Sequence, residues 1–173
     1  MHIQVKPDTG HQGTLHFLGN AYPCALGKSG VTATKREGDH ASPIGVFDLR
    51  AVYYRADKLA KPACVLPCQE ITAQDGWCDD PQTLEYNQRI VLPFSKSHEV
   101  LWRDDDLYDL VVILGHNDNP PVPGAGSCIF MHVAKSDFDG TEGCVALNKP
   151  DLLELLSNVS ADTQIKILPL KTI

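Results

Sequence analysis

Short apolar segments separated by glycine and proline constrain the fold of this chain more than any other feature of its sequence. Thirteen glycines and twelve prolines are spread over 173 residues, and both residue types interrupt helices and mark turns. The segments between them are rich in Val, Ile, Leu and aromatic residues, which favour strands. They predict strands over residues 2–5, 14–18, 46–53, 89–92, 99–103, 110–114, 128–133, 144–147 and 164–168. We therefore expect a mainly β fold, a sandwich or a barrel.

Two segments say more about the architecture. The run LVVIL at residues 110–114 is uniformly apolar, which is typical of a strand buried on both faces. A helix is predicted directly after the strand at 144–147, because Asn148 can cap it, Pro150 fits its first turn and Asp151 favours its positive end. Its apolar stripe consists of Leu152, Leu153, Leu155 and Leu156. A second short helix is predicted over residues 56–60.

Composition limits the partners of the chain. We expect one domain over residues 1–173, since no repeat or linker interrupts the pattern. The net charge is −7 and the only basic cluster is the pair Lys35-Arg36, which argues against nucleic acid and anionic membranes as partners. No apolar run has the length of a membrane span, and the N-terminal residues lack the pattern of a secretory signal. The compartment stays undecided, and we expect a monomer.

A histidine and a cysteine give the strongest chemical indication. His132 ends an apolar run, and Cys144 follows Gly143 twelve residues later. An imidazole beside a thiol can take its proton and hold a thiolate–imidazolium pair. The glycine allows a sharp turn, so that the N–H groups of Gly143 and Cys144 can both point at one oxygen. The alternative is a buried structural cysteine and a hydrogen-bonded core histidine.

The other cysteines and one loop leave alternatives open. Cys64 and Cys68 have no second pair at zinc-ligand spacing, so buried thiols or one local disulfide are favoured over a metal site. Residues 117–126 (NDNPPVPGAG) cannot form regular structure easily because of their prolines and glycines. This loop is either a mobile lid over a cleft or a plain surface connection.

Four ordered segments carry a family resemblance. They are residues 35–47 (KREGDHASPIGVF), residues 75–81 (DGWCDDP) with Tyr86-Asn87 following, Gly115-His116-Asn117, and residues 126–132 (GSCIFMH) leading to 141–147 (TEGCVAL). Each segment is weak alone, but a histidine before Ser/Thr-x-Gly-Cys is fairly specific. Together they resemble the L,D-transpeptidase catalytic domain family, also called YkuD-like. The match runs from about Gly27 to the C-terminal strand.

The resemblance implies a fold and an activity. It implies a YkuD-like β sandwich or barrel in which Cys144 is the nucleophile, His132 its base, and Gly143 with Cys144 the source of oxyanion N–H groups. Such enzymes cleave peptidoglycan tetrapeptide stems between diaminopimelate and D-alanine and pass the acyl group to an amine or to water. The resemblance implies no metal and no cofactor. The candidate substrate-binding residues are His116, Asn117, Ser127, Thr141 and Glu142.

The sequence also departs from the family pattern. No arginine follows Arg103, so Arg103, Lys135 or Lys149 would have to replace the downstream arginine of many members. Glu142 beside the nucleophile disfavours a thiolate unless it points away, and it is a candidate for binding the amine of diaminopimelate. The candidates for orienting His132 are a backbone carbonyl and the loop residues Asp137 and Asp139, and the sequence does not decide between them.

Three functions remain in competition. The first is a cysteine-dependent L,D-transpeptidase, with a hydrolytic carboxypeptidase of the same fold as a variant that sequence does not separate from it. The second is a catalytically silent domain that binds peptidoglycan peptides. The third is a zinc module built from Cys and His. Selective alkylation of Cys144 near pH 6 is the expected sign of the first.

Overall fold

The computed structural model describes residues 1–171 and consists mainly of strands. The one helix among these residues is α1 (Lys149–Ser157). The strands are β1 (His2–Pro7), β2 (Gln12–Phe17), β3 (Asn20–Ala25), β4 (Val31–Thr32), β5 (Ser42–Pro43), β6 (Gly45–Tyr54), β7 (Cys68–Glu70), β8 (Asp75–Cys78), β9 (Arg89–Val91), β10 (His98–Val100), β11 (Leu110–Leu114), β12 (Phe130–Val133), β13 (Val145–Leu147) and β14 (Gln164–Ile167).

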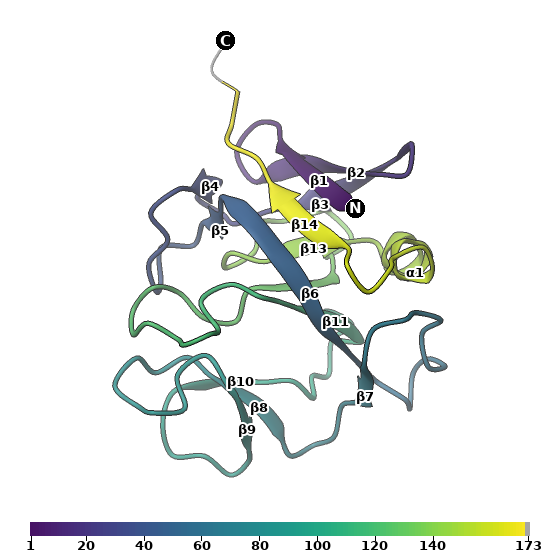
Figure 1. Ribbon diagram of the computed structural model, residues 1–173. Coiled ribbons are helices and arrows are strands. Elements are labelled where there is room, and N and C mark those ends of the chain that lie inside the picture. The colour runs from purple at the N-terminus through teal and green to yellow at the C-terminus, as the bar shows by residue number, and fades with distance from the viewer. Residues whose placement is uncertain (172–173) are drawn as a thin grey trace.

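The largest sheet closes on itself as a barrel. Its order is β11-β12-β13-β3-β2-β1-β14-β6, and β6 pairs again with β11 to complete the ring. β7 adds to β6 outside the ring. Figure 1 shows β6 as the long strand that crosses the molecule from the β4–β5 pair towards β7. Closure leaves few open strand edges in the ring, and it confirms the expected mainly β fold.

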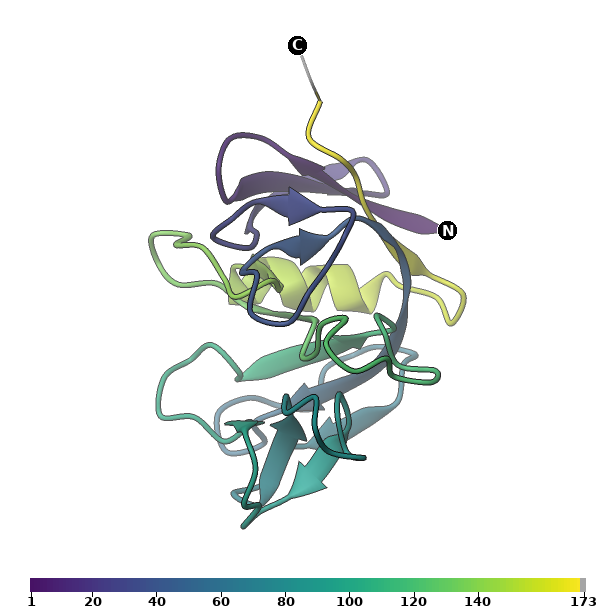
Figure 2. The same ribbon diagram turned by 90° about the vertical axis from the view of Figure 1, so that its left-hand side faces the viewer.

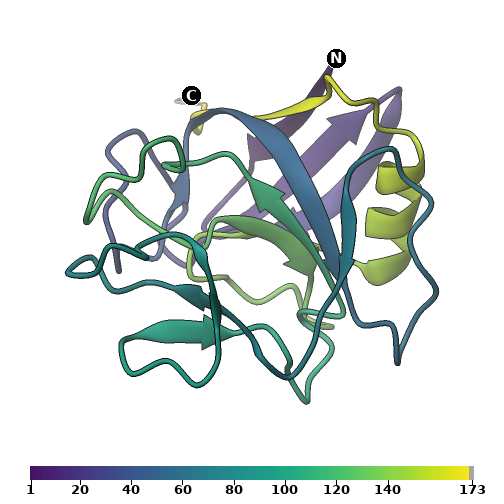
Figure 3. The ribbon, with the colours of Figure 1, turned by 60° about the horizontal axis from the view of Figure 1, so that its bottom comes forward.

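A second sheet of three strands, β10-β8-β9, lies beside the barrel. Figure 3 shows this small sheet as a layer separate from the ring, while α1 covers the barrel on another side. β4 and β5 form a short parallel pair of their own, which Figure 2 shows in front of the barrel strands. The small sheet matters for function because its contact with the barrel forms the wall of a cavity.

The apolar strand β11 belongs to two hydrophobic cores. Its residues Leu110, Val112 and Leu114 pack inside the barrel, whereas Val111 and Ile113 pack against the small sheet. All five are buried, which confirms the prediction of a strand covered on both faces. β12 alternates in the same way, with Met131 and Val133 inside the barrel. Its other side chains, Phe130 and His132, therefore lie on the side of the small sheet.

All nine predicted strands are present, with ends that differ by at most three residues. Five further strands, β3–β5, β7 and β8, were not predicted. β3 was missed because it contains Pro23, which usually argues against a strand. It is formed through a tight hairpin with β2, in which Leu18 and Gly19 both have positive φ (49° and 86°), the backbone of a primed turn that suits the twist of paired strands.

The helix predictions were half right. α1 follows β13 as expected, with a proline in its first turn, and it buries Leu152, Leu155 and Leu156. Asn148 occupies the N-cap position, as predicted, but its side chain makes no capping hydrogen bond. The second helix over residues 56–60 is wrong. A single turn forms there, closed by the N–H groups of Lys58 and Leu59 on the carbonyl of Arg55, and Pro62 follows too closely for a helix to extend.

Candidate active site

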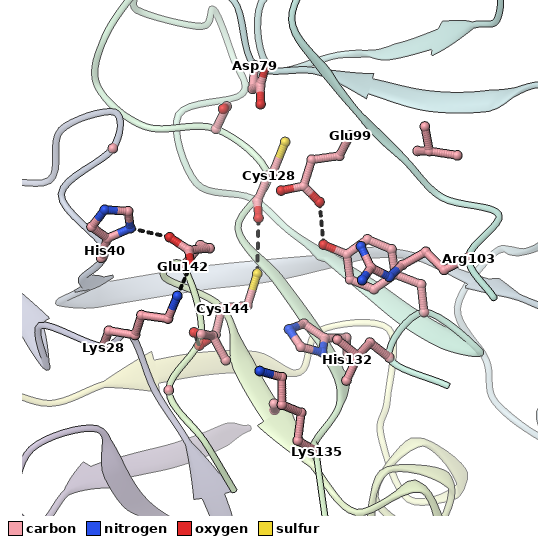
Figure 4. A pocket seen from close by; sticks show the side chains of 18 of the residues that line it. Lys28, His40, Asp79, Glu99, Arg103, Cys128, His132, Lys135, Glu142 and Cys144 are labelled. Atoms are coloured by element: carbon pink, nitrogen blue, oxygen red, sulfur yellow. Dashed lines mark hydrogen bonds and ion pairs between the residues drawn. The ribbon is translucent and has the colours of Figure 1, made fainter. Parts of the chain in front are cut away.

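A cavity of about 650 Å³ opens between the barrel and the small sheet. Its floor comes from the strands β12 and β13, which pair in parallel with His132 opposite Ala146. Its walls come from β10, from the chain before β11 and from the segment before β13. Both His132 and Cys144 line it, and Figure 4 shows the imidazole ring beside the sulfur. The fold therefore brings the two candidate catalytic side chains into one cavity.

Cys144 is held by backbone groups. Its thiol donates to the carbonyl of Cys128 over 3.2 Å, and its sulfur accepts the N–H of Phe130 over 3.5 Å. The residue is 6% exposed. Gly143 precedes it with φ +137°, and a Cβ there would lie 2.9 Å from the carbonyl oxygen of Ala41. Only glycine fits that backbone without strain, so the turn that places the sulfur depends on this residue.

His132 is fixed from both sides of its ring. Its Nδ1 lies 2.9 Å from the carbonyl oxygen of Val133, and the ring of Tyr108 meets it edge-on at a centroid distance of 5.4 Å. Of the candidate orienting groups, the structure thus places a backbone carbonyl beside the ring. Since a carbonyl only accepts, Nδ1 carries the proton in the neutral ring and Nε2 is the basic nitrogen.

The thiol and the imidazole are both uncharged in the free protein. Burial raises the pKa of Cys144 to about 12, with Glu99 adding to the rise. Burial lowers the pKa of His132 to about 4. At neutral pH the pair is therefore thiol and neutral imidazole. The predicted resting ion pair is thus not favoured here, because the cavity floor desolvates both groups.

Backbone contacts around the nucleophile limit the donors available to an oxyanion. The N–H of Gly143 donates to Thr141 Oγ1 over 3.1 Å, and that hydroxyl donates to the Cys144 carbonyl over 2.8 Å. Ser42 Oγ reaches the same carbonyl at 3.3 Å. Thr141 thus lines the cavity, as expected, and also ties the turn together. The Gly143 N–H is already bound to Thr141 in this arrangement. Of the two N–H groups predicted to stabilise an oxyanion, this leaves that of Cys144.

Glu142 points away from the nucleophile. Its carboxylate contacts Lys28 Nζ and His40 Nδ1 at the cavity wall, as Figure 4 shows. The hydrogen bond from Lys28 is the main reason that its pKa is lowered. The carboxylate is therefore not free to bind a substrate amine in this structure, although it still contributes to the raised pKa of Cys144.

His116 and Asn117 do not line the cavity. His116 Nε2 lies 3.0 Å from the Ala125 carbonyl oxygen, and Asn117 Nδ2 donates to the carbonyls of Val122 and Gly126. These bonds brace the loop 117–126 from within. Both residues thus hold this loop, none of whose residues lines the cavity, and their role in substrate binding stays a prediction.

Ser127 lines the cavity as expected. Its hydroxyl donates to Glu37 Oε2 over 2.7 Å, and the Tyr86 hydroxyl contacts the same oxygen. The residue after Tyr86 is Asn87, and its side-chain oxygen accepts a hydrogen bond from the Cys128 N–H at 3.1 Å. These contacts link the small sheet to the chain that carries the Cys128 carbonyl, and so to the nucleophile.

Three cations were predicted as substitutes for the missing arginine. Lys149 is paired with the buried Asp109 at 2.6 Å and does not line the cavity. Arg103 and Lys135 do line it, but they are paired with Asp105 and Asp139. The structure adds Lys35 as a fourth candidate. Its ammonium is buried and lies 3.3 Å from the position that a Cβ on Gly143 would take. Its positive charge lowers the pKa of Cys144. It was overlooked because it is far from Cys144 in sequence.

A scan against protein-family models matches residues 12–167 to the L,D-transpeptidase catalytic domain, YkuD. The chain belongs to this family. A search of curated proteins and a search of solved structures each found no match. The match confirms the resemblance carried by the sequence segments, and it assigns the chain to a family that acts on peptidoglycan peptides.

The YkuD domain holds further cavity residues that sequence reasoning did not select. Glu99, Tyr108, Cys128 and Asp79 all line the cavity beside Cys144. Glu99 lies on β10, opposite Trp77 of β8, at the start of a segment that the sequence marks only as a strand. Only the pairing of β10 with β8 turns its side chain toward the nucleophile, so no local signal could have identified it.

The cysteines of this YkuD domain are all free thiols. The sulfurs of Cys64 and Cys68 lie 3.2 Å apart without a bond, so the local disulfide that the sequence left open is not formed here. Within residues 1–171 no group of three or more His, Cys, Asp or Glu side chains is placed to hold a metal ion. In the same residues no helix has the length and apolarity needed to cross a membrane.

Proposed function

We propose that this chain is a cysteine-dependent L,D-transpeptidase that acts on peptidoglycan stem peptides through a thioester acyl-enzyme. The observation that carries the proposal is that Cys144 and His132 line one cavity in a YkuD domain. The cleaved bond would be the one between diaminopimelate and D-alanine. The acyl group then passes to an amine, or to water in a hydrolytic side reaction.

The neutral resting pair favours general-base catalysis over attack by a preformed thiolate. His132 Nε2 takes the thiol proton as Cys144 Sγ attacks the carbonyl carbon. The Cys144 N–H stabilises the charge on the carbonyl oxygen, a contribution of about 3 kcal/mol for one such donor. The imidazolium then protonates the leaving amine of D-alanine, and the thioester remains. The acceptor amine gives its proton to His132 as its nitrogen attacks the thioester carbon. The C–S bond then breaks, and the imidazolium returns the proton to the Cys144 thiolate.

The experiment combines a stem tetrapeptide with intact-mass spectrometry. Wild type should gain the mass of the acyl tripeptide and release D-alanine, whereas Cys144→Ala should do neither. His132→Asn should form the adduct at least about 100-fold more slowly, because general-base catalysis contributes that much. An added amine acceptor separates transfer from hydrolysis, since only transfer yields the cross-linked product.

A catalytically silent peptide-binding domain is the second candidate. The raised pKa of Cys144 and the lowered pKa of His132 favour it, since a binding domain needs no reactive thiol. It predicts that wild type and Cys144→Ala bind the tetrapeptide equally well and that neither releases D-alanine. That result would replace the transpeptidase proposal.

A further inference from the structure

Positive charges in the cavity are already neutralised by neighbouring carboxylates. Lys28 contacts Glu142, Lys135 lies 3.0 Å from Asp139, and Arg103 lies 2.6 Å from Asp105. None of these cations is therefore available to balance another carboxylate without breaking its own pair. The charge of Arg103 also lowers the pKa of Glu99, but the ion pair that Arg103 forms is with Asp105.

Two carboxylates on the wall have no such partner. Among residues 1–171 neither Asp79 nor Glu99 forms an ion pair, and Asp79 Oδ1 is buried without any hydrogen bond. Glu99 receives one hydrogen bond from the neutral hydroxyl of Tyr108. A third unpaired carboxylate, Glu37, differs because two hydroxyls saturate one of its oxygens.

The two carboxylates lie on either side of Cys128. Figure 4 shows Asp79 above the Cys128 sulfur and Glu99 beside it, with Cys144 directly below. Their mutual repulsion is one reason, after burial, that the pKa of Glu99 is raised. Both side chains are partly buried, which is unfavourable for an unpaired carboxylate, and a cation that hydrogen-bonds to them offsets part of that cost. The wall is thus built for a positive group at this point.

We propose that Glu99 and Asp79 form a subsite for a primary ammonium group on the acyl-donor residue of the substrate. The inference rests on the proposed function, in which the donor residue is diaminopimelate. One amino group of that residue is part of the peptide and the other is free. The free ammonium lies at the end of a flexible side chain, and the scissile carbonyl lies at the other end, over Cys144.

An ammonium suits the subsite better than other cations. Its three N–H donors point in different directions and can meet two carboxylates from separate elements, whereas the planar guanidinium fork matches a single carboxylate. A divalent metal ion would need more ligands than the two carboxylates supply, and the described residues hold no cluster of three.

Occupancy of the subsite also affects the nucleophile. Glu99 is the second cause, after burial, of the raised pKa of Cys144, and Glu142 acts in the same direction, while Lys35 and the Phe130 N–H oppose them. An ammonium beside Glu99 offsets its charge, which favours the thiolate. The thiol is then most acidic when a donor with an ammonium group is in place. A donor without that group therefore loses both binding and rate.

The test compares two stem peptides that differ only in the side-chain amine of the donor residue, free in one and acetylated in the other. Binding is measured by calorimetry to Cys144→Ala, so that no reaction interferes. We expect the free amine to bind at least about tenfold more tightly, the effect of one hydrogen-bonded charge pair. Glu99→Gln, which keeps an acceptor for Tyr108, and Asp79→Asn should each reduce that preference. Glu85→Gln, which removes an exposed carboxylate outside the cavity, should leave it unchanged.

The outcomes separate the subsite from the activity. Equal binding of the two peptides, or a preference that survives in Glu99→Gln and Asp79→Asn, overturns the ammonium subsite even if wild type forms an acyl adduct. A preference that both variants lose supports the subsite even if the protein with Cys144 forms no adduct, in which case only the transpeptidase proposal fails. Thermal unfolding of each variant shows whether it is folded before its affinity is interpreted.

Discussion

Cys144 works in surroundings that keep its sulfur protonated. The thiol donates to one backbone carbonyl, accepts one backbone N–H and lies on the same cavity wall as Glu99 and Tyr108. Such surroundings protect the thiol from oxidation, because the thiolate is the reactive form. They also mean that reactivity has to be induced by the imidazole and by the substrate, so the pH dependence of the free thiol is informative.

We predict that alkylation of Cys144 by iodoacetamide is slow near pH 6 and rises steadily through the alkaline range, since the pKa is about 12. Glu99→Gln should raise the rate at pH 8 by roughly three- to tenfold, because one unit of pKa changes the thiolate fraction tenfold. Peptide mapping by mass spectrometry distinguishes Cys144 from the half-buried Cys64 and Cys68. A plateau already reached at pH 6 contradicts the neutral pair and restores the thiolate–imidazolium pair. Glu85→Gln is the matched control.

At the level of elements, Asn87 joins the small sheet to the chain around the nucleophile. Its Oδ1 accepts from Trp77 Nε1 and from the Cys128 N–H, each at 3.1 Å. Its Nδ2 donates to the carbonyls of His116 and Asn117 at 3.0 and 2.8 Å. All four hydrogen-bonding positions of the amide are thus used in a buried site. The cavity between the two sheets depends on this side chain.

We predict that Asn87→Asp lowers the free energy of unfolding by about 3 kcal/mol, because two carbonyl oxygens would then face a carboxylate that has no donor for them. Urea unfolding at neutral pH measures the loss. Acyl-adduct formation should fall as well, because Cys128 loses its fixed position. Gln4→Glu, the same amide-to-acid change at an exposed site on β1, should alter stability by less than about 0.5 kcal/mol. Equal effects of the two substitutions would show that the four bonds contribute little.

How much the sequence predicts differs between the strands and the cavity. The apolar runs of β6, β11, β12 and β13 specify their own conformation, so their positions were predicted within a few residues. β8 (DGWC) carries no such pattern, since it becomes a strand only through its two neighbours, β9 and β10. The pair His132 and Cys144 was predictable from one short segment. Glu99 was not, because its place in the cavity depends on pairing between strands distant in the sequence.

For the whole molecule, the buried imidazole links stability to acidity. Its pKa of about 4 in the folded protein lies below the ordinary value of 6.5. Between these two values the unfolded chain binds a proton at this position and the folded chain does not. The contribution of the neutral His132 to stability is therefore fully present above pH 6.5, and it is lost as the pH falls from 6.5 to 4. Burial lowers the pKa of His116 too, which acts in the same direction.

We predict that wild type loses about 3 kcal/mol from this group between pH 7 and 4, from the size of the shift and the energy of one pKa unit. His132→Asn removes the group, so its unfolding free energy should depend less on pH over the same range, whatever its stability at pH 7. Urea unfolding at pH 7.0, 5.5 and 4.5 provides the comparison. His2→Asn, at an exposed position, should keep the slope of the wild type. Identical slopes for wild type and His132→Asn exclude the imidazole as the cause.

The parallel pairing of β1 with β14 has a consequence for biosynthesis. His2 to Val5 lie beside Gln164 to Ile167. This pairing, here called the seam of the ring, joins the first strand of the chain to the last. A ribosome-bound chain that has not yet released residues 164–167 cannot close that seam, and β1 and β6 both keep an open edge until then. Nascent chains of this protein are therefore exposed to edge-to-edge association during translation.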